Sequence, residues 1–131
     1  MTRIESDKVT IDKPAKEVFD FLSDFNNFEK LMPEQVTNWK STPDECSFTI
    51  QGMASLGMKI VEKKPNTLIR IAKNGSAPFD FSLNCILEEL QQQSSIQLAF
   101  EVDLNPMMKM MAVKPLTNFL NILVHKLKDI V

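Results

Sequence analysis

Residues 106–131 read PMMKMMAVKPLTNFLNILVHKLKDIV, and this C-terminal stretch decides which fold the chain can adopt. Asn105 followed by Pro106 is a favourable N-cap and first-position pair, so a long helix is expected to begin there. At about 100° per residue from Leu116, these apolar side chains fall within about 60° of one line: Ala112, Phe119, Leu120, Leu123, Leu127 and Ile130. This stripe predicts a helix that lies on an apolar sheet.

A methionine cluster precedes the stripe, and Pro115 stands between the two. An unbroken helix would place Met107, Met110 and Met111 on the face opposite Leu116. Because Pro115 cannot donate to the carbonyl of Met111, a kink or break is expected there that turns the methionines inward. Two interpretations follow: flexible core filler at one end of the fold, or an adaptable gate or partner surface.

The region between Val36 and Leu104 has an apolar period of 2, with turn signals spaced as in an antiparallel meander of about six strands. Turns are expected at 42–45, at Gly52 and Gly57, at 65–66 and at 91–94. At 74–76 a three-residue loop is expected, because it pairs Ile71 with Phe79 and keeps the apolar faces aligned.

The N-terminal region is predicted to contain one strand and two short helices. Residues 2–11 alternate as a strand does, and Pro14 suits the first turn of a helix that continues to Ser23. Capping side chains at 23–27 begin a second helix, which Pro33 ends. Without helical crossovers between the later strands, this order predicts an α+β domain with one antiparallel sheet of about seven strands.

Composition narrows the function classes. The 131 residues are expected to form one domain, and the net charge of −2 is scattered, so no nucleic-acid footprint is present. Cys46 and Cys85 lie in apolar runs and are expected to be buried thiols of a reducing compartment, with a disulfide as the alternative. The N-terminus lacks a signal-peptide core and no apolar run approaches about 20 residues, so a soluble cytoplasmic protein without an integral membrane segment is expected.

The order of elements, together with residues 11–28 (IDKPAKEVFDFLSDFNNF), resembles the START-like (SRPBCC) superfamily over the whole chain. That superfamily includes polyketide cyclase/dehydrase, lipid-transport and Bet v 1-like proteins. The resemblance implies a helix-grip fold, in which a curved antiparallel sheet wraps around the C-terminal helix. It also implies a cavity between them for lipids, sterols, polyketides or other apolar molecules. No catalytic set of the cyclases is found at matching positions.

Catalytic chemistry has few candidates in this sequence. His125, the single histidine, lies opposite the Leu116 stripe and is expected to face water. With one histidine and two separated cysteines, no metal site, cofactor or nucleophile–base pair is expected. Glu62 and Lys73 share strand parity with apolar neighbours and are weak candidates for acid–base catalysis from the cavity wall. Both lie near strand ends, where long side chains usually reach water.

The leading hypothesis is therefore binding or carriage of a small hydrophobic molecule or lipid, driven by burial of apolar surface. One alternative is a cyclase- or dehydratase-like enzyme that uses Glu62 or Lys73. Another is a protein-interaction module with a filled cavity, which docks a partner through the cluster at Met107–Met111. The residues expected to bind the ligand are Phe28, Leu31, Phe48, Ile50, Met58, Ile60, Ile69, Ile71, Phe79, Phe81, Leu83, Phe100, Met107, Met111, Leu116, Phe119, Leu120 and Leu123.

Overall fold

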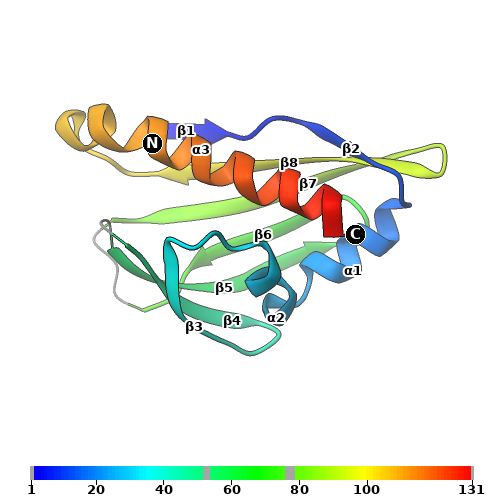
Figure 1. Ribbon diagram of the computed structural model, residues 1–131, viewed down its shortest axis with the longest axis horizontal. Coiled ribbons are helices and arrows are strands. Elements are labelled where there is room, and N and C mark those ends of the chain that lie inside the picture. The colour runs from blue at the N-terminus through cyan, green and yellow to red at the C-terminus, as the bar shows by residue number, and fades with distance from the viewer. Residues whose placement is uncertain (1, 52–53, 76–78, 131) are drawn as a thin grey trace.

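The computed structural model describes residues 2–51, 54–75 and 79–130, and shows one long helix lying against a curved sheet (Figure 1). The elements are, in chain order, β1 (Thr2–Glu5), β2 (Val9–Ile11), α1 (Ala15–Leu22), α2 (Phe25–Phe28), the 3₁₀ turn η1 (Glu29–Leu31), β3 (Val36–Ser41), β4 (Glu45–Ile50), β5 (Ala54–Lys64), β6 (Leu68–Lys73), β7 (Phe81–Leu90), β8 (Gln93–Val102) and α3 (Pro106–Ile130). This arrangement confirms the α+β helix-grip prediction.

The sheet has eight antiparallel strands in the order β1-β8-β7-β6-β5-β4-β3, and β2 also pairs with β8. The eighth strand arises because the expected first strand is divided. Glu5 pairs with Ala99 and Val9 with Ile96, so the N-terminal segment has one residue more than its partner between these pairs. Ser6 lies in this break, and its Oγ accepts a 2.9 Å hydrogen bond from the Leu98 N–H.

The short helices are confirmed, and side chains satisfy their N-terminal donors. Pro14 precedes α1 and has no side chain that can cap it, but Glu89 of β7 supplies Oε2, which accepts a 2.6 Å bond from the Ala15 N–H. The N-cap of α2 is Asp24, whose Oδ1 lies 2.8 Å from the Asn26 nitrogen. These bonds fasten α1 to the sheet and fix the turn into α2.

Helix α3 begins as expected, since Asn105 Oδ1 accepts a 2.8 Å bond from the Met108 N–H. A kink or break at Pro115 was expected to turn the methionines inward. This prediction is wrong, because α3 runs unbroken across that residue. The helix contacts β1, β2, β8 and η1. In the part of the chain that the structure describes, no helix is long and apolar enough to cross a bilayer.

The hairpin at 42–45 is confirmed by a 2.9 Å bond from the Thr42 N–H to the Glu45 carbonyl, but the β6–β7 connection differs from the prediction. Ile71 pairs with Leu83 instead of Phe79. The two registers differ by an even number of residues, so both keep the same apolar face and the alternation cannot distinguish them. Ser76, the last residue of the expected loop, lies outside the described residues.

Gly57 does not mark a bend, because it lies inside β5 opposite Ser47. Its carbonyl accepts a 2.9 Å bond from the Asn74 N–H, and a Cβ at this position would overlap the Asn74 backbone oxygen. Glycine is therefore required here by close backbone approach. Gly52, the other residue of the expected bend, lies outside the described residues.

Candidate functional site

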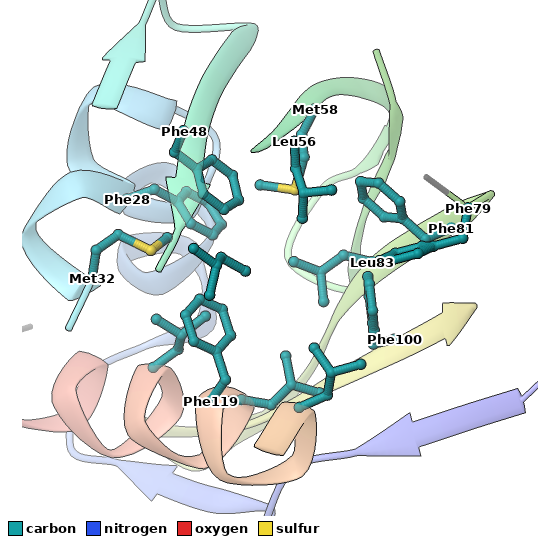
Figure 2. Close-up of a pocket in the computed structure, with 14 residues that line it drawn as sticks. Phe28, Met32, Phe48, Leu56, Met58, Phe79, Phe81, Leu83, Phe100 and Phe119 are labelled. Atoms are coloured by element: carbon teal, nitrogen blue, oxygen red, sulfur yellow. The ribbon is translucent and has the colours of Figure 1, made fainter. Parts of the chain in front are cut away.

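A cavity lies between α3, the short helices and the inner face of the sheet, and side chains from all three converge on it (Figure 2). Every residue that lines it is apolar: Phe28, Met32, Phe48, Ile50, Leu56, Met58, Phe79, Phe81, Leu83, Phe100, Leu116, Phe119, Leu120 and Leu123. A void with such a wall offers water no hydrogen-bond partners and is expected to be dry.

Aromatic rings form much of the wall. Phe81 lies between Phe79 and Phe100, with ring centroids 6.0 and 5.3 Å apart respectively. On another part of the wall, Phe48 is stacked on Trp39 of the edge strand β3 at 5.2 Å. Tilted and stacked contacts of this kind are favourable arrangements of aromatic rings and help to fix the relative positions of these side chains.

The cavity is small, with a volume of about 40 Å³. Pockets that hold drug-sized ligands have volumes of about 300–1,000 Å³. A ligand of that size therefore fits only after side chains of the wall move apart.

Many of the residues predicted to bind a ligand do line this cavity, although their part in binding stays a prediction. They are Phe28, Phe48, Ile50, Met58, Phe79, Phe81, Leu83, Phe100, Leu116, Phe119, Leu120 and Leu123. The prediction omitted Leu56, because the segment around Gly57 was interpreted as a bend and not as a strand. It also omitted Met32, which follows η1.

Four other predicted residues do not line the cavity. Ile69 and Ile71 are fully buried, because α1 packs across β6, β7 and β8 and closes the space in front of them. Leu31 is buried in the core behind the lining side chains, and Ile60 is a half-buried residue packed against the core. Ile69, Ile71 and Leu31 are therefore core residues with almost no accessible surface, whereas Ile60 keeps part of its surface exposed outside the cavity lining.

Met107 and Met111 are wrong as cavity residues, since each is 73% exposed. Both belong to the first turns of α3, which lie at the far end of the helix from its buried C-terminal turns (Figure 1). The interpretation of these residues as core filler is excluded by their exposure.

Glu62 is wrong as a cavity-facing residue because β5 has an irregular register between Ile60 and Glu62. After this bulge the faces of the strand are exchanged, and Glu62 pairs with the exposed Arg70, with Oε1 and Nη1 3.3 Å apart. Strand parity before the bulge therefore could not predict where Glu62 lies.

Lys73 also does not reach the cavity. Its Nζ donates a 2.7 Å hydrogen bond to Asp80 Oδ1 at the end of β6. With Glu62 on the outer face and Lys73 in this ion pair, the described lining of the cavity includes no ionisable group.

The remaining groups of chemical interest are structural. His125 is exposed as predicted, with its Nε2 3.0 Å from Asp7 Oδ2 in the β1–β2 connection. Cys46 and Cys85 are buried free thiols, as expected, and burial raises the pKa of each from 9.0 to about 12. Thiols in this state are un-ionised near neutral pH and are poor nucleophiles.

Comparison with known proteins supports the fold strongly. No protein-family model matches the chain, and no curated protein matches it in sequence. Among solved structures, TTHA0849 from Thermus thermophilus has a TM-score of 0.78 at 10% identity, over 98% of this chain and 95% of its own. A START superfamily protein from Mycobacterium smegmatis has a TM-score of 0.71 at 14% identity, over 98% of this chain and 99% of its own.

A further neighbour is the di-domain ARO/CYC protein BexL from the BE-7585A biosynthetic pathway. It has a TM-score of 0.69 at 15% identity, and the match covers 98% of this chain but only 47% of that protein. These similarities show that the chain has the START-like fold. At such identities they concern the fold alone.

Proposed function

We propose that this chain binds a small apolar molecule between its sheet and α3, and carries or sequesters it as a single cytoplasmic domain. The observation that carries the proposal is the cavity with an entirely apolar wall beneath the helix. Removing apolar surface from water contributes about 25 cal/mol per Å² before the costs of ordering. The START superfamily neighbour supports the proposal by analogy of fold, and the two buried free thiols suit a reducing compartment.

Binding in this site requires the cavity to enlarge. A guest that fits only the enlarged form shifts the population toward it, and its apparent affinity is reduced by the fraction of molecules that are open. The proposal therefore predicts modest affinity and slow uptake for a rigid guest, and easier uptake for a flexible chain.

Trp39 provides the measurement that tests this proposal. It is the only tryptophan in a chain without tyrosine, and it stacks on Phe48, whose ring lines the cavity. Titration with the neutral probe decanol is expected to change Trp39 fluorescence saturably. In Leu120→Phe, which fills the cavity, affinity is expected to fall about tenfold or more.

The control is Val61→Phe, which adds a ring at a residue that is 48% exposed and outside the lining. This variant is expected to bind decanol as the unaltered chain does. Equal binding by Leu120→Phe, with far-ultraviolet circular dichroism showing that it is folded, would place any decanol site elsewhere and reject the proposal.

A second candidate function is docking of a protein partner through the first half of α3. It is favoured by Met107, Met110 and Met111, which are 73, 88 and 73% exposed. Flexible thioether side chains are typical of adaptable binding surfaces. The enzymatic alternative requires Glu62 or Lys73 in the cavity, and neither side chain reaches it.

A further inference from the structure

A second hollow adjoins the cavity on the outside of the molecule and differs from it in chemistry. This outer groove has a volume of about 400 Å³ and lies between α3 and the segments that flank β3 and β4. Its lining comprises Gln35, Ile50, Gln51, Lys114, Pro115, Leu116, Asn118, Phe119 and Ile122. Unlike the cavity, the groove therefore has polar groups beside apolar ones.

Three side chains line both hollows and form the wall between them: Ile50, Leu116 and Phe119. Ile50 and Leu116 are buried, with exposed fractions of 8% and 4%, whereas Phe119 is only half-buried. Phe119 extends from α3 toward the sheet in Figure 2. Because Phe119 is the least buried of the three, it is the side chain freest to change rotamer, and we take it as the movable part of this wall.

The groove is lined by the amide side chains of Gln35, Gln51 and Asn118, which can donate hydrogen bonds, and by Lys114. The Gln51 N–H donates a 2.8 Å bond to the Gln35 carbonyl, which holds the two glutamines on adjacent segments. Among the described residues that line the groove, Lys114 is the one charged residue and none has a carboxylate. In the described part of the chain, Lys114 forms no ion pair.

We propose that the ligand is a single-chain amphiphile with an anionic head, such as a carboxylate with an alkyl tail. The tail enters the cavity past Phe119, and the head stays in the outer groove near Lys114, Gln51 and Asn118. This inference rests on the proposed function, because the tail uses the same cavity. Its new content is the orientation of the ligand and the sign of its charge.

The polarity of the two hollows determines this orientation. An ionised head within the cavity would lose its hydration and find no polar partner there, which is a large cost. In the groove, the same head keeps water and gains a cation and amide donors. A flexible tail can also pass a narrow opening that a rigid ring system cannot, and each methylene that becomes buried is expected to tighten binding about fourfold.

The test compares decanoate with decanol, which have the same number of carbons and differ in the head. At about pH 7.5 the carboxylate is ionised, and at low salt it is expected to bind about fivefold more tightly than the alcohol. Lys114→Met is expected to abolish this preference while decanol affinity stays within about twofold. Lys128→Met makes the same change of charge on an exposed residue of α3 outside the groove, and is expected to keep the preference.

The results separate this inference from the proposed function. Equal affinity of the two probes for the unaltered chain overturns the inference alone, as does a preference for decanoate that survives in Lys114→Met. Loss of the preference in Lys128→Met to the same extent assigns it to overall charge and also overturns the inference. If neither probe changes Trp39 fluorescence or gives heat in calorimetry, both the proposed function and this inference are overturned.

Discussion

The two halves of α3 are in opposite situations although they belong to one continuous helix. In Pro106–Pro115 no residue is buried, whereas the half from Leu116 onward has five buried residues: Leu116, Leu120, Leu123, Val124 and Leu127. Pro115 ends the exposed half, and its missing N–H leaves the Met111 carbonyl without its helical donor. The first half packs on the core through the partly buried Ala112 and Val113, while the second is held there by fully buried side chains.

A gradient of packing also exists within the buried half. Leu127 is 1% exposed and does not line the cavity, whereas Leu116 lines both hollows. Tight packing around Leu127 and the unfilled space beside Leu116 allow the site to open while the fold persists.

The largest effect is expected at the tightly packed end. Leu127→Ala should lower the free energy of unfolding by about 4 kcal/mol, because it creates a new void in a filled core. Leu116→Ala should cost about 2 kcal/mol, since the deleted atoms already border empty space. Urea unfolding measures both. Equal losses would show that packing is uniform along the buried half.

Phe119→Ala is expected to cost about 2 kcal/mol, below the usual range for phenylalanine because the ring is only half-buried. The same variant should take up decanol faster in stopped-flow measurements of Trp39 fluorescence, since the movable part of the wall is gone. Unchanged uptake kinetics would mean that the ligand enters by another route.

The two buried thiols allow loosely and tightly packed regions to be compared within the sheet. Cys46 pairs with the cavity residue Met58, whereas Cys85 pairs with the fully buried Ile69. Burial raises the pKa of both thiols to about 12, so each stabilises the fold below the unfolded value of 9.0 and loses that contribution as pH rises. Between pH 9 and 10 each thiol should cost about 1 kcal/mol of stability.

Cys85→Ala is the variant that isolates one of these contributions. Between pH 9 and 10, the free energy of unfolding of the unaltered chain should fall by about 1 kcal/mol more than that of Cys85→Ala. The measurement is urea unfolding at both pH values. Identical pH dependence of the two proteins would contradict burial of the Cys85 thiol.

The smallest effect is expected in the exposed half. Replacing Met107, Met110 and Met111 by glutamine should change the free energy of unfolding by less than about 0.5 kcal/mol, because exposed residues contribute little to stability. A loss of several kcal/mol would show that these side chains are covered in solution. Sedimentation of both proteins would show whether the methionines mediate self-association.

Periodicity predicted the parts of this fold that depend on neighbours in sequence. In the predicted stripe, Leu116, Leu120, Leu123 and Leu127 are buried as expected and Ala112 and Phe119 are half-buried, but the prediction is wrong for Ile130, which is 42% exposed. The alternation of β7 and β8 placed Phe81, Leu83 and Phe100 on the inner face. These predictions succeed because a helix or strand repeats its geometry from one residue to the next.

Other features depend on irregularities and distant contacts that a local pattern does not record. The bulge before Glu62 reverses the strand faces without a distinctive residue to mark it. Whether Ile71 lines a cavity depends on α1 lying across β6. The Met107 segment was expected to turn inward through a kink or break at Pro115, yet α3 continues without a break through Pro115 and leaves Met107, Met110 and Met111 exposed.

The pairing of β1 with β8 has a consequence for synthesis of the protein. Thr2 pairs with Val102, so β1 cannot pair with its neighbour until β8 has been translated, and α3 follows later still. Contacts between such distant segments slow folding, because a long loop must close before the pairing is formed. A nascent chain stalled before β8 would therefore expose the inner face of its meander to chaperones.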